Sequence, residues 1–102
     1  MDTKQRAKDA LRRVADAVGG QSAVAALVGL KDRRGIWPYF NTDRALPPEY
    51  CPPLEKASAM VGKRVTCEDL APDVTWRRVP DPEWIWHADG KPLVDVAPRI
   101  AA

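Results

Sequence analysis

Breaks in the chain constrain its fold more than any other feature of the sequence. Ten prolines and six glycines are spread over 102 residues, so most uninterrupted stretches are too short for an extended helix. The first stretch is the exception, because the first break is the glycine pair at 19 and 20. A chain of this length supports one modest hydrophobic core. We therefore expect short elements packed around a single core, with one longer helix at the N-terminus.

Two helices are predicted before residue 30. Along Thr3–Val18, apolar residues recur every three or four positions with lysines and arginines between them, the pattern of an amphipathic helix. The glycine pair ends it, because glycine adopts the left-handed C-terminal turn without steric cost. A second helix of about nine residues follows at once. Gln21 and Ser22 are expected to cap its first free amides, and Gly29 to stop it.

A third helix is expected within residues 30–40. Apolar side chains there surround a polar, basic segment at residues 31–34. Gly35 and Pro38 are poor helix formers, and an interior proline costs a helix roughly 3 kcal/mol. The helix is therefore short, kinked, or begins only near Trp37.

Two proline pairs shape the next helix. Residues 41–46 are predicted to form a loop, and the first proline pair opens a turn at residues 48–51. The main helix is predicted at residues 52–60, since proline is tolerated in a first helical turn. Its buried side chains are expected to be Leu54, Ala57 and Met60.

The helical part of the chain ends after one further short turn. Thr66 with Asp69 resembles a capping pattern for a helical turn that ends at Leu70. We expect residues 1–72 to form a helical domain and residues 73–102 to form a C-terminal extension.

The extension is predicted to carry one β-hairpin. Apolar runs at residues 84–86 and 93–96 flank an Asp-Gly pair, which favours a tight turn. A two-stranded ribbon is marginal alone, so it must pack on the helices or pair with another chain. Pairing with a second copy gives a two-fold dimer, which suits a palindromic DNA site with half-sites about 34 Å apart. In the alternative, Trp84, Ile85 and Trp86 cover the helical core within one chain.

Charge and hydropathy narrow the classes of protein that the sequence fits. The net charge is only +2, but residues 1–46 carry 9 − 5 = +4 and the remainder carries 7 − 9 = −2. A basic half favours contact with polyanions, although a solvated helical face explains it equally well. The longest stretch free of charged and strongly polar residues, at residues 23–30, is far shorter than the ~20 residues of a membrane span.

We expect no catalysis, no metal and no cofactor. His87 is the sole histidine, the two cysteines form no Cys-x-x-Cys pair, and neither a phosphate-binding glycine loop nor a nucleophile elbow occurs. The alternative is a nucleophile at Cys51 or Cys67 acting with His87, but free cysteines are usually inert core residues. Two cysteines give no disulfide framework, and the charged N-terminus lacks the apolar core of a secretion signal. We therefore expect a reduced, cytoplasmic protein.

Residues 21–39 have the layout of a helix-turn-helix. Ala25 is a small residue that lets two helices approach, and Gly29 permits the tight turn between them. In such a motif the second helix enters the major groove with its N-terminal residues at the base edges. Here that end carries Arg33 and Arg34, and arginine can bind guanine O6 and N7 with two hydrogen bonds. The alternative is a plain helical hairpin with a solvated basic turn.

Three segments resemble a known family: GGQSAVAALVGL, WPYFNTDRALPPEYCPPLEKA and VTCEDLAPDVTW. Together they are similar to the Cro-like, YdaS-type helix-turn-helix proteins of phages and prophages, over roughly residues 8–79. The combination is far more specific than any one segment. With the hairpin, the resemblance implies a mainly α fold, a lambda-repressor-like helix-turn-helix bundle of four to five short helices with a C-terminal β-hairpin.

The resemblance implies a Cro-type transcriptional repressor that binds double-stranded DNA, and we expect a homodimer. It places Gln21 and Ser22 on backbone phosphates, and four further side chains on the groove-reading side: Lys31, Arg33, Arg34 and Trp37. The full set of expected DNA-binding residues is Gln21, Ser22, Lys31, Asp32, Arg33, Arg34, Trp37 and Arg44. The alternative function is an antitoxin-like module that neutralises a partner protein, with the aromatic hairpin as its docking surface.

Overall fold

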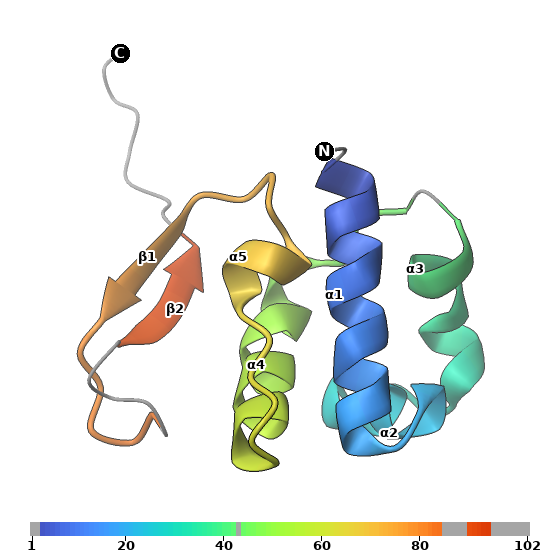
Figure 1. Cartoon of the computed structure of the whole chain (residues 1–102), viewed down its shortest axis with the longest axis horizontal. Coiled ribbons are helices and arrows are strands. Elements are labelled where there is room, and N and C mark those ends of the chain that lie inside the picture. The colour runs from blue at the N-terminus through green and yellow to red at the C-terminus, as the bar shows by residue number, and fades with distance from the viewer. Residues whose placement is uncertain (1–2, 43, 85–89, 95–102) are drawn as a thin grey trace.

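The computed structural model describes residues 3–42, 44–84 and 90–94. Its elements follow in the order α1 (Thr3–Val18), α2 (Gln21–Leu27), η1 (Arg33–Gly35), α3 (Trp37–Asn41), η2 (Pro48–Tyr50), α4 (Cys51–Met60), α5 (Cys67–Leu70), β1 (Trp76–Val79) and β2 (Lys91–Val94). The predicted mainly α bundle with a C-terminal hairpin is confirmed (Figure 1). Within the described ranges, no helix combines the length and apolar character that a bilayer span requires.

The helix α1 is the centre of the bundle. It contacts all four other α-helices, with α4 and α5 on one side and α3 on the other (Figure 1). Its apolar face is buried, as the amphipathic pattern predicts. The buried side chains on this face are Ala10, Leu11, Val14 and Ala15.

Glycine turns set the entry and the exit of α2. Gly19 and Gly20 have φ angles of 106° and 115°, and both amides donate to the carbonyl of Ala15. Gly20 occupies the cap position of α2, so the expectation that Gln21 and Ser22 cap this helix is wrong. They form its first turn instead. The helix ends before Gly29 (φ 83°), as predicted.

The element expected within residues 30–40 is divided in two. A 3₁₀ turn at η1 is followed by the five-residue helix α3, which begins at Trp37. Pro38 lies in the first turn of α3, where its missing N–H breaks no helical hydrogen bond. Buried Ile36 joins the two pieces to the core. Of the three arrangements expected for this segment, the structure has the short helix that starts near Trp37.

The helix α4 is rotated relative to the prediction. It begins at Cys51 after a 3₁₀ turn, one residue earlier than expected. Leu54 is buried as predicted, but Ala57 is half-buried and Met60 is 65% exposed. The face that the helix buries instead includes two polar residues, Glu55 and Ser58, which are not among the predicted buried side chains. Its buried side chains are Cys51, Leu54, Glu55, Ser58 and Ala59.

The hairpin exists, but its first strand is not the predicted one. Strand β1 pairs with β2 antiparallel, from Trp76 opposite Val94 to Val79 opposite Lys91. Trp84, expected in a strand, is buried and only 6% exposed, while residues 85–89 and 95–96 lie outside the described residues. Asp89 of the predicted Asp-Gly turn also lies outside the described residues, and Gly90 directly precedes β2. At Gly90, a Cβ atom would come within 2.9 Å of the Val79 amide nitrogen, so the glycine allows a close backbone approach.

A buried carboxylate attaches the hairpin to the helices. Glu55 of α4 has no exposed surface, and its two oxygens accept hydrogen bonds from Arg78 of β1 at 2.8 and 2.9 Å. Arg64 and the backbone amide of Cys67 donate to the same carboxylate, at 3.0 and 2.7 Å. Arg78 also pairs with Glu68 of α5 at 2.6 Å. One side chain therefore connects α4, the start of α5 and β1.

The hydrogen bonds keep this carboxylate ionised. Burial by itself raises the pKa of Glu55, because it removes the charge from water. The hydrogen bonds from Arg78 and Cys67, together with the charge of Arg78, outweigh burial and hold the pKa below its ordinary value of 4.5. The bond to Glu55 in turn raises the pKa of Arg78. The pair is therefore charged at neutral pH.

Replacing Glu55 by glutamine should destabilise the protein strongly. The E55Q side chain keeps the shape but removes the charge that balances Arg78, and breaking a buried pair on one side costs about 3 kcal/mol or more. Urea denaturation should show this loss in the free energy of unfolding. The matched control is E49Q, at an exposed position of η2, which should change that free energy by less than about 0.5 kcal/mol. A loss below about 1 kcal/mol for E55Q would show that the network contributes little.

The contribution of Glu55 should also depend on pH. Its pKa is lower in the folded than in the unfolded chain, so its stabilisation is complete above the ordinary value of 4.5 and is lost as the pH falls from there through the folded pKa. Urea midpoints of the natural protein and of E55Q should therefore converge as the pH is lowered from 7 to 3. Other carboxylates titrate in both proteins and cancel in this difference. A gap that stays constant over this pH range would contradict the assignment.

Candidate nucleic-acid interface

One open groove gathers most of the predicted binding residues. It has a volume of about 660 Å³ and lies between the start of α2 and the η1–α3 segment. Eight residues line it: Gly19, Gly20, Gln21, Ser22, Arg33, Arg34, Trp37 and Asn41. Residues far from one another in the helix-turn-helix sequence thus face a common surface, which we call the α2–α3 groove.

The glycine turn places Gln21 and Ser22 at this groove. The turn directs the chain from the end of α1 straight into α2, whose buried Val24 and Ala25 anchor it to the core. Around Gly19 and Gly20 there is open space where a side chain would begin, so nothing covers the first turn of α2 from that side. The amide of Gln21 and the hydroxyl of Ser22 are therefore available as hydrogen-bonding groups on this wall.

An aspartate shapes the arginine turn on the opposite wall. Asp32 accepts a hydrogen bond from the backbone amide of Arg34 at 2.9 Å and pairs with the Arg34 guanidinium, also at 2.9 Å. The side-chain hydrogen bond with Arg34 is the main reason that the pKa of Asp32 is lowered and that of Arg34 is raised. The Arg34 side chain is nevertheless 88% exposed. Asp32 therefore orients Arg34 at the groove without removing it from solvent.

Helix α3 adds an aromatic and an amide group. Trp37, at its first position, is 51% exposed, whereas Phe40 is buried in the core. Asn41 donates a hydrogen bond from Nδ2 to the carbonyl of Trp37 at 3.0 Å, and it lines the groove. Asn41 is not among the predicted binding residues, because the sequence predicts a loop at residues 41–46. Its spacing of four residues from Trp37 was the signal that both lie on one helical face.

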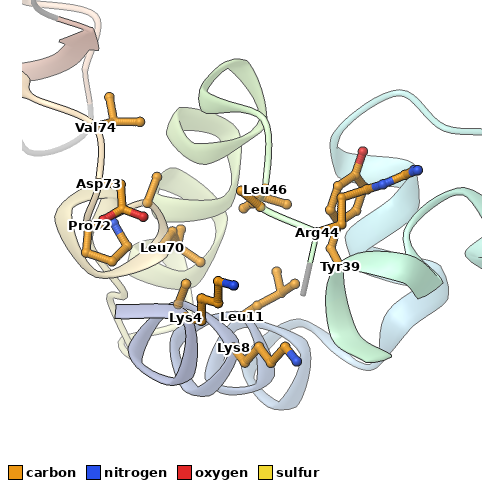
Figure 2. Close-up of a pocket in the computed structure, with 13 residues that line it drawn as sticks. Lys4, Lys8, Leu11, Tyr39, Arg44, Leu46, Leu70, Pro72, Asp73 and Val74 are labelled. Atoms are coloured by element: carbon orange, nitrogen blue, oxygen red, sulfur yellow. The ribbon is translucent and has the colours of Figure 1, made fainter. Parts of the chain in front are cut away.

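The remaining predicted residues lie outside the groove. Lys31 is exposed in the bend before η1 and is not among the lining residues. Arg44 lies beside Tyr39 at a different pocket, between α1 and the segment that follows α3 (Figure 2). Arg33 and Arg34 themselves belong to the 3₁₀ turn η1, not to the N-terminal end of the second helix as expected. Gly35, which ends η1, separates them from α3.

The groove offers groups that suit an anionic, hydrogen-bonding partner. Residues 31–34 carry three basic side chains against one acidic one. Exposed guanidinium groups can bind phosphates or guanine edges, and the amide and hydroxyl groups can bind phosphates. An exposed indole can contact the methyl group of thymine or a sugar. The groups that line the groove are thus of the kinds that contact phosphates, sugars and bases.

Metal-ligating side chains and cysteines are the other groups in the described residues that could carry chemistry. In the ranges that the structure describes, no three side chains of His, Cys, Asp or Glu gather in a way that could hold a metal ion. Cys51 and Cys67 are free and buried. A hydrogen bond with Cys51, together with burial, raises the pKa of the Cys67 thiol, so this sulfur is a poor nucleophile at neutral pH.

Comparisons with known proteins agree with the sequence resemblance. A curated relative from Escherichia coli (strain K12), named "Putative transcriptional regulator YdaS", is 41% identical over 59 residues. The match covers 58% of this chain and 56% of the relative, so it spans little more than half of that protein. No solved structure matches the chain. Residues 11–79, from the third turn of α1 to the end of β1, match the model of the family described as "Bacterial toxin YdaS". Because this match extends over well over half of the sequence, the chain belongs to the YdaS family.

Proposed function

We propose that the chain is a sequence-specific DNA-binding transcriptional regulator, a Cro-type repressor that presents the α2–α3 groove to double-stranded DNA. The observation that carries this proposal is the convergence of five expected binding residues on one exposed, basic groove: Gln21, Ser22, Arg33, Arg34 and Trp37. The name of the Escherichia coli relative, a transcriptional regulator, supports the same role. The DNA-binding part would be residues 1–72.

The broken second helix determines how bases would be read. A five-residue α3 is too short to lie along the major groove as a typical recognition helix does. The η1 turn and Trp37 would enter the groove instead, with Arg33 and Arg34 at base edges. Gln21 would contact a phosphate at the opposite wall. Asp32 acts as a positioning residue for Arg34, and Lys31 adds positive charge beside the site.

A second candidate function is a module that acts on a partner protein, in the manner of an antitoxin. The description of the family as a bacterial toxin favours a role of this kind. The aromatic hairpin is a weaker docking surface than its sequence suggests, because Trp84 is buried and Leu93 is the large apolar residue of the described hairpin that is exposed. Among the described residues, β1 and β2 pair only with each other, so their outer edges could pair with a second copy, and we propose a homodimer on this basis.

DNA binding should be detected by fluorescence anisotropy with a duplex from the region upstream of the protein's own gene. Because binding releases counterions from phosphates, the logarithm of the association constant should fall linearly with the logarithm of salt, by roughly 0.9 for each phosphate contacted. An unrelated duplex of equal length is the control for specificity. Absent or salt-insensitive binding would contradict the proposal. Co-purification of a neighbouring gene product in that case would favour the second candidate.

Substituting Arg33 or Arg34 by alanine should relax the preference for the specific duplex. Each lost guanidinium contact to a base should cost roughly 1 to 3 kcal/mol on the specific duplex and less on the unrelated one. The matched control is Arg77→Ala, which removes an exposed arginine on β1, outside the α2–α3 groove. It should leave both affinities nearly unchanged. An equal loss on both duplexes for R33A and R34A would make these residues phosphate contacts, and equal effects from R77A would move the interface away from the groove.

A further inference from the structure

Asn41, the last residue of α3, carries an amide group that the proposed function does not yet use. The side chain lines the α2–α3 groove. It also lines a neighbouring open hollow of about 260 Å³, which lies between α1 and the start of α2. Both hollows include Gly20, Gln21 and Asn41 among their lining residues. The Asn41 side chain is therefore exposed and borders open space on two sides.

One hydrogen bond fixes the orientation of this amide. Nδ2 of Asn41 donates to the carbonyl oxygen of Trp37 at 3.0 Å. Because a carbonyl oxygen can only accept, the nitrogen of the amide faces Trp37 and its oxygen does not. One N–H hydrogen and the oxygen Oδ1 then have no partner within the part of the chain that the structure describes. Asn41 thus presents one donor and one acceptor from a side chain whose rotation is restricted.

A donor and an acceptor on one amide match adenine in the major groove of DNA. Adenine presents the acceptor N7 and the N6 amino donor there, and an asparagine side chain can bind both at once. Guanine presents two acceptors, N7 and O6, so one of them would face Oδ1 without a hydrogen between the two oxygens. Arginine has donors only and therefore prefers guanine. A base contact from Asn41 should thus select an A·T pair over a G·C pair.

The position of Asn41 on α3 brings it to the same edge of the duplex as Trp37. Both residues line the α2–α3 groove, and they lie four residues apart on one short helix. Four residues of an α-helix advance about 6 Å along its axis. Base pairs are stacked about 3.4 Å apart, so this advance corresponds to about two base-pair steps. With Trp37 at the bases, Asn41 lies beside a base pair about two steps further along.

We propose that Asn41 is a specificity-determining residue that reads one adenine in the major groove. Nδ2 donates its free hydrogen to adenine N7, and Oδ1 accepts a hydrogen bond from the N6 amino group. This inference rests on the proposed DNA-binding function and deepens it, because it names a base that the site selects. The contact joins neutral groups, so it does not depend on the net charge of the surface.

Base-pair substitutions in the specific duplex test the inference. Each A·T pair is replaced in turn by G·C, and the affinities of the natural protein and of Asn41→Ala are measured by fluorescence anisotropy. At one A·T pair in each half-site, the natural protein should lose at least about fivefold in affinity, whereas N41A should lose less than about twofold.

A modified base tests the same contact without any change in the protein. 7-Deazaadenine lacks the N7 acceptor but still pairs with thymine. At the A·T pair that N41A identifies, it should weaken binding of the natural protein about threefold or more. If N41A folds poorly, the deaza base scanned over all adenines replaces it, and no sensitive adenine in the duplex would overturn the inference.

Gln5→Ala is the matched control, because it also removes an exposed amide. Gln5 lies on α1, where it donates to Asp9 at 2.8 Å, and it lines neither hollow. Q5A should discriminate between base pairs as the natural protein does. An equal loss for N41A on every duplex would make Asn41 a phosphate contact, and unchanged affinity on every duplex would place it outside the interface. Either result overturns the inference and leaves the proposed function in place, whereas a natural protein that binds no duplex refutes both.

Discussion

The charge pair between Glu55 and Arg78 determines how the two parts of the chain are joined. The hairpin has only four residues in each strand, which is too little to form a core of its own. A buried carboxylate is costly unless it is fully hydrogen-bonded, so Glu55 can remain in the interior only while Arg78 and the Cys67 amide stay in place. Ser58, one turn further along α4, similarly holds the next loop by accepting a hydrogen bond from the Val65 amide. These polar contacts hold the hairpin and the loop after α4 in position.

This attachment has a consequence for function. The hairpin is held against α4 and α5, on the side of α1 opposite to α3 (Figure 1). The α2–α3 groove therefore remains uncovered by the described part of the extension. Arg34, in contrast, is exposed, and among the described residues it pairs with Asp32. An ion pair at the surface is weak, so a phosphate or a base can compete for the guanidinium. The described hairpin is thus held by buried ion pairs, whereas the Arg34 ion pair beside the α2–α3 groove is exposed.

The sequence predicted those helices whose bounds depend on residues that are close together in the chain. The periodicity of α1, the glycine pair after it and Gly29 define the first two helices without reference to the rest of the fold. The fold class followed from the same signals and from the family resemblance. Most of the groove residues were also predictable, because they cluster within a short stretch of sequence.

The features that the sequence did not predict depend on contacts between residues that are far apart in the chain. Strand β1 contains two arginines and lacks an alternating apolar pattern, and it becomes a strand because Glu55 fixes Arg78 and β2 pairs with it. The same carboxylate rotates the buried face of α4 away from Met60. Arg44 was predicted to bind DNA together with the groove residues, but the short α3 ends before it and Arg44 lines another pocket. Polar residues at buried positions thus account for much of the difference between the predicted and the observed structure.

The most direct test of this account is to map the DNA contact surface in solution by backbone amide NMR shifts on addition of a specific duplex. The account predicts that the largest changes occur at residues 19–22, at residues 33–37 and at Asn41, with β1 and β2 almost unaffected. Changes centred on β1, β2 and α4, with the groove residues unchanged, would contradict it.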